Sequence, residues 1–250
     1  MGNRARKLGV IMAVLAMVAV AIPLGASSAG AATKDPVIIV AGTFSPSFAN
    51  EPLAARLRAD GYRTYIFELP GLGTGDIGAS GAALNTFADQ VRAQTGAAKV
   101  DLIGHSQGGL VGRDYIKNRG GANEVDSMIS LGAPHYGTYL ANFAAFFGTS
   151  VIGLTSINQM SIGSSFLNGL NAGDDTIGNV KYTNFFTNQD ELVRPVTNAT
   201  LNDGATNVRV QSQCWLRIVG HLGLIVDGTV YSGVQDALEK RSISLNCFAL

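Results

Sequence analysis

A serine between two glycines stands in the most informative stretch of the sequence. The pattern G-x-S-x-G covers residues 104–108 with Ser106 at its centre, and it joins a strand-like run at 99–104 to a helix-like run at 109–117. Such a strand-to-helix turn holds the serine in a strained backbone conformation, and the glycines let the neighbouring elements pass close to it. The spacing predicts that Ser106 is a nucleophile.

A nucleophilic serine needs a general base, and the chain contains three histidines. His105 adjoins Ser106, but neighbouring residues of a strand point to opposite faces. His135 precedes every acid in a suitable position, which favours a structural hydrogen-bonding role. His221 follows a predicted strand at 216–219, so we expect it on a loop at the carboxyl edge of a sheet, where open α/β sheets bind ligands. We predict that His221 is the general base.

An acid is needed to orient this histidine and to stabilise its charged form. In chains with this turn the order along the sequence is serine, acid, histidine. Asp190 follows a predicted strand by a short polar turn and so reaches the same edge of the sheet. The other acids between Ser106 and His221 lie on a helix, at the opposite edge or in loops. We predict Asp190 as the acid, with Glu191 as the close competitor.

An oxyanion formed at Ser106 needs two N–H donors. One is the backbone N–H of Gln107, the residue after the nucleophile. The other is expected from the loop after the first strand, where the N–H of Thr43 is placed to turn inward and its hydroxyl adds a third donor. The alternative is that Thr43 only caps a turn. Losing one such donor typically lowers the rate by about 10²–10³.

Strand-like and helix-like runs alternate along the chain and would position these residues. Strands are predicted at 37–41, 62–69, 99–104, 125–131, 180–186 and 216–219, and helices at 51–60, 83–94, 108–117 and 231–240. Such alternation is typical of an α/β domain with a mainly parallel sheet. We expect one such domain over residues 33–250, with about six strands flanked by helices. Residues 141–170 carry no charge and break the alternation. This segment is either a buried crossover connection or the rim of an apolar pocket, and both can hold at once.

The composition excludes two classes of protein. Apolar residues make up 46% of the chain and charged residues only 14%, against about 25% in an average soluble protein, which argues against intrinsic disorder. Lys and Arg total 18, as do Asp and Glu, and no basic run occurs beyond the N-terminus. We therefore expect no binding to nucleic acid.

The first 32 residues have the pattern of a secretory signal peptide. Arg4, Arg6 and Lys7 precede a chargeless run of fifteen residues, 8–22, and small residues follow at 29–32. We expect cleavage after Ala31 or Ala32, which leaves 15 basic and 18 acidic side chains, a net charge of −3. The apolar run is short for a membrane span, so we expect a secreted protein without stable membrane insertion.

Both cysteines, Cys214 and Cys247, lie in the expected mature chain. In an oxidising compartment an even pair is most simply one disulfide. The bridge would close residues 214–247, a stretch of 34 residues, into a loop. The alternative is two unpaired buried thiols.

Taken together, the chain resembles the secreted class 2 lipases of the α/β-hydrolase superfamily over residues 36–238. The resemblance is carried by TGAAKVDLIGHSQGG at 95–109, LGAPHYGT at 131–138, NQDELV at 188–193 and VGH at 219–221. Some segments also resemble yeast lipase B: Gly42-Thr43, SQG at 106–108, Asp190-Glu191 and Cys214. One departure is that many relatives have His-Gly at the oxyanion loop, whereas this chain has Ala41-Gly42.

The resemblance implies an α/β-hydrolase fold with a minimal or small lid. It implies hydrolysis of acylglycerols or other esters at a lipid–water interface by a monomer, without a cofactor or a metal ion. Ser106 would attack the ester, His221 would carry the proton, and Asp190 would orient His221. We further hypothesise an acyl pocket or small mobile lid in the chargeless segment. Its candidate residues are Phe143, Phe146, Phe147, Ile152, Leu154, Ile157 and Ile162.

Other interpretations stay open at this point. A short-chain esterase or polyester hydrolase would use the same triad, and chain-length preference with activity on emulsions distinguishes it from a lipase. A secreted acyltransferase is distinguished by its products with an alcohol acceptor. A catalytically silent binding protein of the same fold is disfavoured, because nucleophile, acid and base all occur in the expected order.

Overall fold

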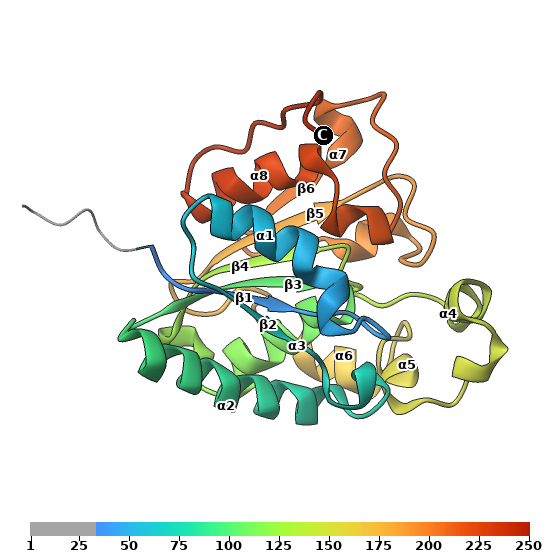
Figure 1. Cartoon of the computed structure of the whole chain (residues 1–250). Coiled ribbons are helices and arrows are strands. Elements are labelled where there is room, and N and C mark those ends of the chain that lie inside the picture. Colours follow the sequence, from blue (N-terminus) through green and yellow to red (C-terminus); the bar gives the residue numbers. More distant parts are fainter. Residues whose placement is uncertain (1–33) are drawn as a thin grey trace, which may run out of the picture. The chain divides into compact units, whose positions relative to one another are not determined.

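A six-stranded sheet forms the centre of the structure, and all of its strand pairings are parallel (Figure 1). The computed structural model describes residues 34–250, so the predicted signal peptide lies outside the described residues. The strands are β1 (Val37–Val40), β2 (Thr64–Phe67), β3 (Val100–His105), β4 (Val125–Leu131), β5 (Lys181–Phe186) and β6 (Thr206–Arg209). Their spatial order is β2-β1-β3-β4-β5-β6, which confirms the predicted parallel α/β architecture.

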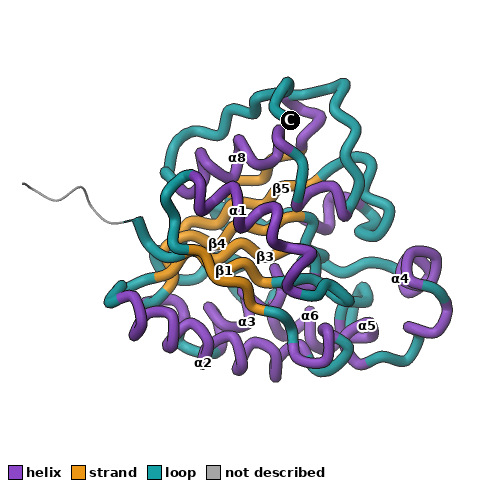
Figure 2. Tube along the Cα trace, viewed as in Figure 1, coloured by secondary structure: helices purple, strands orange, loops and turns teal. Residues whose placement is uncertain are grey.

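Helices cover both faces of this sheet (Figure 2). They are α1 (Glu51–Ala59), α2 (Ile77–Thr95), α3 (Gln107–Asn118), α4 (Leu140–Phe147), α5 (Thr155–Gln159), α6 (Ser165–Leu170), α7 (Val210–Gln213) and α8 (Gly228–Leu238). Helices α1 and α8 pack on one face, and α2 and α3 on the other. Within residues 34–250, no helix is long and apolar enough to cross a bilayer.

The side chains of β1 explain the two layers. Ile38 and Val40 pack into the core shared with α2 and α3, whereas Val37 and Ile39 pack into the core shared with α1 and α8. All four are fully buried, as expected for a parallel strand covered on both faces. The unbroken apolar run that predicted this strand therefore reflects burial on both sides.

Helix α2 begins six residues earlier than the predicted 83–94. Its N-cap is Asp76, whose carboxylate accepts the N–H of Ala79 at 2.7 Å. Gly78 and Gly81 lie in its first turns, and glycine lowers helix propensity. The side chain of Asp114 explains Gly81, because a Cβ there would lie 2.1 Å from its Oδ2. Close packing between α2 and α3 thus requires a glycine in the first turns of α2, and this glycine is the reason that the sequence pattern misses the start of the helix.

The sixth strand differs from the sequence prediction. The predicted strand at 216–219 is wrong, because this segment is a loop in which Leu216 and Ile218 are 71% and 84% exposed. The strand that completes the sheet, β6, is polar and buries only Val208. An edge strand needs little apolar character, so the apolar pattern identified the wrong segment.

Cys214 and Cys247 form a disulfide, as predicted. The bridge attaches the C-terminal segment to the end of α7. Gln213 reinforces this attachment, since its side-chain oxygen accepts the N–H of Leu245 at 2.8 Å.

Removing the bridge should lower the free energy of unfolding. The chain-entropy model gives about 3–4 kcal/mol for a loop of this length. We expect this loss in the double variant Cys214→Ala/Cys247→Ala, measured by urea denaturation against the oxidised parent. Reductant should not destabilise the double variant further. A loss below about 1 kcal/mol would show that noncovalent contacts alone hold the C-terminal segment in place.

Candidate active site

Ser106 occupies a sharp turn between β3 and α3. Its φ of 53° and ψ of −124° place a side-chain-bearing residue in a strained conformation. Both flanking glycines are required there. A Cβ on Gly104 would lie 2.6 Å from the backbone of Gly108, and a Cβ on Gly108 would lie 2.2 Å from the carbonyl oxygen of Val40. The turn expected from the G-x-S-x-G spacing is present.

His221 and Asp190 form a buried pair at the carboxyl edge of the sheet. Nδ1 of His221 lies 2.9 Å from Oδ2 of Asp190, and each side chain is 1% exposed. The other oxygen, Oδ1, accepts the backbone N–H groups of Leu192 and Val193 at 2.9 and 2.7 Å. These two bonds fix the rotation of the carboxylate, so Oδ2 stays directed at the imidazole ring.

Glu191, the competing acid, holds the same histidine at a different point. Its Oε2 accepts the backbone N–H of His221 at 2.8 Å. Gly220 makes room for this contact, because a Cβ there would lie 2.2 Å from Oε1 of Glu191. Asp190 therefore contacts the ring of His221, and Glu191 contacts its backbone.

Gly132 is a site residue that the sequence reasoning missed. It follows β4 with a φ of 60°. A Cβ there would lie 3.2 Å from Oδ2 of Asp190, 3.3 Å from Nδ1 of His221 and 2.8 Å from Cδ1 of Leu224. The glycine lets β4 end against the acid–histidine pair. The available signal was a glycine directly after a buried strand.

Ser106 and His221 line one cavity of about 270 Å³. The other lining residues are Thr43, Phe44, Ser45, Ala49, His105, Phe147, Leu222, Ile225 and Val226. Nε2 of His221 is buried and has no hydrogen-bond partner among the described residues. The acid thus engages one ring nitrogen of His221 and leaves the other for a hydroxyl in the cavity.

His105 packs against the ring of His221 and contacts its backbone. The two ring centroids lie 4.9 Å apart, and Nε2 of His105 lies 3.1 Å from the carbonyl oxygen of His221. Burial, followed by the neighbouring His221, lowers the pKa of His105 to about 3. The ring is therefore neutral at pH 7, and Nε2 must carry the proton that this carbonyl oxygen accepts.

Thr43 and Gln107 lie side by side next to Ser106. The hydroxyl of Thr43 donates to Oε1 of Gln107 at 2.6 Å. The backbone N–H of Gln107 begins α3, where the first N–H groups of a helix have no acceptor within it. Nε2 of Gln107 is buried without a partner among residues 34–250. Rotating the side-chain amide of Gln107 by half a turn would let its Nε2 donate to the hydroxyl oxygen of Thr43. The hydroxyl proton of Thr43 would then be free to donate to a bound oxyanion.

The predicted acyl-pocket residues have different surroundings. Phe147 lines the cavity and packs against Phe44, with ring centroids 5.2 Å apart. Phe146 meets the ring of His221 edge-on at 5.8 Å. The other five lie elsewhere: Phe143 and Ile157 are buried in the core, Leu154 packs against that core, and Ile152 and Ile162 are exposed. The structure brings two of the seven to the site.

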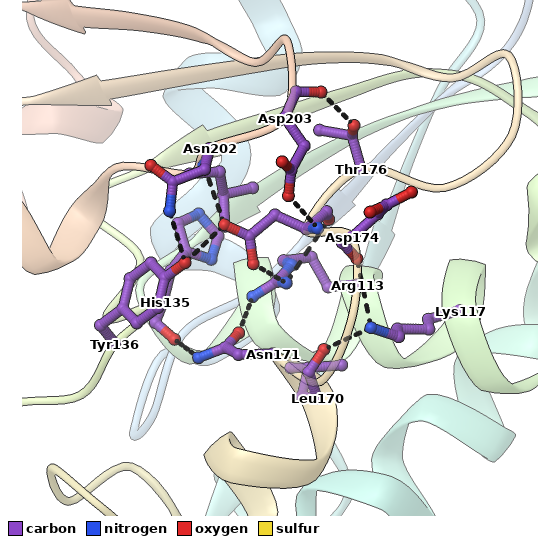
Figure 3. Close-up of polar contacts among 12 residues, drawn as sticks. Arg113, Lys117, His135, Tyr136, Leu170, Asn171, Asp174, Thr176, Asn202 and Asp203 are labelled. Carbon is purple, nitrogen blue, oxygen red and sulfur yellow. Dashed lines mark hydrogen bonds and ion pairs between the residues drawn. The ribbon is translucent and has the colours of Figure 1, made fainter.

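His135 belongs to a separate polar cluster around Arg113 (Figure 3). Its Nε2 lies 3.1 Å from Oδ1 of Asn184, and its carbonyl oxygen accepts from Asn171. Arg113, 2% exposed, donates to Asn171 and forms an ion pair with Asp175 at 3.3 Å. These contacts join α3 to the loop before β5. His135 thus has the structural hydrogen-bonding surroundings that the sequence order favoured.

Metal ligands are not assembled in the described structure. Among residues 34–250, no group of three or more His, Cys, Asp or Glu side chains is placed to hold a metal ion. The ammonium group of Lys117 lies where three carbonyl oxygens converge, those of Leu170, Ala172 and Asp174, at 2.6–3.2 Å. A protein cation therefore already neutralises this cluster of carbonyl dipoles.

The sheet order, the strained serine turn and the acid–histidine pair together define a hydrolase-like α/β domain. Residues 35–219 match the family model described as alpha/beta hydrolase fold. The chain belongs to this family.

Similar proteins are known from several organisms. Two triacylglycerol lipases, from Pseudarthrobacter phenanthrenivorans and Burkholderia plantarii, are each 38% identical over 120 residues, which is 45% of this chain and 37% and 33% of their own lengths. The match spans about a third of these curated relatives. The crystal structure of Aspergillus fumigatus lipase B is similar with a TM-score of 0.73 at 21% identity, covering 84% of this chain and 54% of that one.

A second similar structure is the lipase BlEst2 of Bacillus licheniformis in its mature form. Its TM-score is 0.68 at 20% identity, and the alignment covers 83% of this chain and 93% of that chain. At this identity the likeness shows a shared fold. The shared fold therefore covers nearly the whole of the BlEst2 chain.

Proposed function

We propose that this protein is a serine carboxylester hydrolase that acts on acylglycerols. The observation that carries the proposal is the pairing of Asp190 with one ring nitrogen of His221, while the other nitrogen has no partner among residues 34–250 and the residue lines the same cavity as Ser106. A strained serine, a histidine and a buried carboxylate are the parts of an acyl-transfer triad.

In the proposed reaction Ser106 attacks the ester carbonyl carbon while His221 Nε2 accepts its hydroxyl proton. Asp190 keeps the other proton on Nδ1 and stabilises the imidazolium. The oxyanion is bound by the N–H groups of Gln107 and Thr43, with the hydroxyl of Thr43 as a third donor. His221 then protonates the leaving alcohol. Water attacks the acyl-enzyme with the same histidine as base, which releases the acid and restores Ser106.

The size and lining of the cavity support an apolar acyl group as the bound part of the substrate. The cavity, about 270 Å³, is slightly smaller than the roughly 300–1,000 Å³ of sites that enclose a whole small ligand. Phe147, Ile225 and Val226 give it an apolar wall. A site of this size holds one chain around the scissile bond and leaves the rest of a larger lipid outside. The triacylglycerol lipases among the relatives make acylglycerols the favoured class.

We also propose that the protein is exported and cleaved near residue 32. The basic start, the apolar run and the small residues at 29–32 support export. The disulfide between Cys214 and Cys247 is consistent with an oxidising compartment.

Covalent labelling tests the proposed nucleophile directly. An alkyl p-nitrophenyl phosphonate should modify the wild-type protein once, on Ser106, with release of one equivalent of p-nitrophenol. Intact-mass and peptide mass spectrometry locate the adduct. The variant Ser106→Ala, as the matched control, should remain unmodified. Labelling of both proteins to the same extent would refute the proposed nucleophile.

The substrate class is tested separately, with p-nitrophenyl esters of increasing chain length and with emulsified tributyrin and triolein. A lipase hydrolyses the emulsions and accepts long acyl chains. Activity restricted to short soluble esters would retain the proposal of a serine hydrolase. It would change the proposed substrate class from acylglycerols to short-chain esters.

A further inference from the structure

Large apolar side chains that reach solvent gather at one edge of the described structure. Of fourteen such residues, twelve lie in segments that leave the carboxyl ends of β1, β2, β4 and β6. The other two, Phe248 and Leu250, lie in the C-terminal segment, which the disulfide and a contact with Gly228 bring back to the same side. The edge of the sheet that bears Ser106 is therefore also the apolar edge.

The most exposed group on this edge is a loop closed by the disulfide. We call residues 214–218 together with Phe248 the clamped loop. Trp215, Leu216, Ile218 and Phe248 are 77%, 71%, 84% and 92% exposed. Trp215, Leu216 and Phe248 line a hollow of about 330 Å³ together with both cysteines, Gln213 and Arg217. The bridge between Cys214 and Cys247 thus holds side chains from two distant segments in one apolar cluster.

The clamped loop carries almost no charge. Between residues 210 and 226 the only Lys, Arg, Asp or Glu is Arg217, and residues 242–250 contain none of these four types. The guanidinium of Arg217 pairs with the carboxylate of Asp227 at 2.7 Å. Transferring this surface out of water therefore carries no cost of dehydrating an unpaired charged side chain.

The apolar surface continues from the clamped loop to the mouth of the catalytic cavity. Leu222 and Val226 are 59% and 46% exposed, and both line the cavity that contains Ser106 and His221. Only three residues separate Leu222 from Ile218 in the chain. A substrate held in an apolar phase against this surface would meet the cavity without crossing water.

We propose that the clamped loop anchors the protein to an uncharged lipid surface. The choice of a lipid partner rests on the proposed function, because such a surface would supply acylglycerol to the cavity. A cluster of side chains exposed by 71–92% suits insertion among headgroups and acyl chains, and Trp is well suited to that boundary. The near absence of charge favours neutral over anionic lipid, in contrast to the basic faces that bind acidic membranes.

Trp215 makes the test specific, because it is the only tryptophan of the chain. Binding is measured on the Ser106→Ala chain, so that hydrolysis plays no part. With vesicles of dioleoyl phosphatidylcholine, the emission of Trp215 should move to shorter wavelength, and brominated phosphatidylcholine should quench it. The double substitution Leu216→Ser/Ile218→Ser should weaken vesicle binding at least about tenfold, since each buried aliphatic side chain contributes strongly to transfer. Raising the salt concentration should leave binding unchanged.

Ile152 provides the matched control, because it is 56% exposed on a different segment of the same edge. Ile152→Ser should change vesicle binding less than about twofold. Equal losses in both variants would overturn the assignment to the clamped loop. Trp215 emission that stays unshifted with vesicles, or that shifts with protein concentration alone, would also overturn it, the latter by showing contact between copies of the chain.

Activity measurements on the chain with Ser106 intact distinguish failure of the lipid anchor from failure of the proposed hydrolase function. Leu216→Ser/Ile218→Ser should hydrolyse soluble p-nitrophenyl acetate at the wild-type rate and emulsified triolein at least about tenfold more slowly at low enzyme concentration. Normal vesicle binding by a chain that hydrolyses neither ester would refute the hydrolase and retain the lipid anchor. Equal loss on both substrates would refute the anchor role.

Discussion

Asp190→Asn is expected to lower kcat for ester hydrolysis about 10⁴-fold, the cost of presenting the wrong histidine tautomer. The reason lies in the two N–H groups, of Leu192 and Val193, that Oδ1 of Asp190 accepts. In the variant the amide oxygen must keep these bonds, which turns the amide NH₂ toward Nδ1 of His221. Nδ1 then has to accept, so the ring proton moves to Nε2, and Nε2 can no longer take the proton of Ser106.

Glu191→Gln is the matched control, since it removes the neighbouring carboxylate charge and keeps the side-chain oxygen. That oxygen can still accept the backbone N–H of His221, so the position of the histidine is preserved. We expect a loss in kcat below about tenfold. Both rates are measured on p-nitrophenyl butyrate with active sites counted by phosphonate titration. Equal losses in the two variants would contradict the assignment of separate roles to the two acids.

The difference between the two acids shows a limit of sequence reasoning. Asp190 and Glu191 follow the same strand and reach the same edge, so their order in the chain could only rank them. What separates them is the direction of each side chain, toward the ring of His221 or toward its backbone. That direction depends on the fold of the loop after β5, where Leu192 and Val193 donate to one carboxylate and not to the other. The contacts of the two acids with His221 span 31 and 30 residues of the chain, so no local pattern encodes them.

The parts of the site that the sequence does predict are those fixed by the backbone. Ser106 needs a turn with no Cβ at positions 104 and 108, and the spacing of the glycines states that requirement. The same reasoning applied to Gly132 predicts a close approach of another group at that position, which in the structure is the acid–histidine pair. Glycines after buried strands are therefore informative even without a named motif.

The apolar pattern was less reliable at the surface than in the core. It predicted β1 because that strand is buried on both faces, but it placed the sixth strand at 216–219. It also assigned the acyl pocket to residues 141–170, whereas most of the cavity wall comes from residues 43–49 and 221–226. Apolar character alone distinguishes neither an exposed loop from a buried strand nor a cavity wall from the core, where Phe143 and Ile157 lie. Leu216 and Ile218 instead face outward, at the surface we propose for lipid.

Thr43→Val is expected to lower kcat about 10²-fold with little change in KM. Valine has the shape of threonine but no hydroxyl, so the variant removes one donor from the oxyanion and keeps the backbone N–H groups. An oxyanion-hole donor acts mainly in the transition state, which is why its loss affects kcat by about 10²–10³. Steady-state kinetics on p-nitrophenyl butyrate measure the effect.

Two companion variants separate the hydroxyl from its surroundings. Thr43→Ser keeps the donor and should retain kcat within about fivefold. Gln107→Leu removes the amide that Thr43 contacts at 2.6 Å but keeps the N–H of residue 107, so its loss should be smaller than that of Thr43→Val. A larger loss in Gln107→Leu would mean that the amide, by receiving the hydroxyl proton or by donating after a half-turn, sets the orientation of Thr43. Full activity in Thr43→Val would leave the oxyanion to the two backbone N–H groups alone.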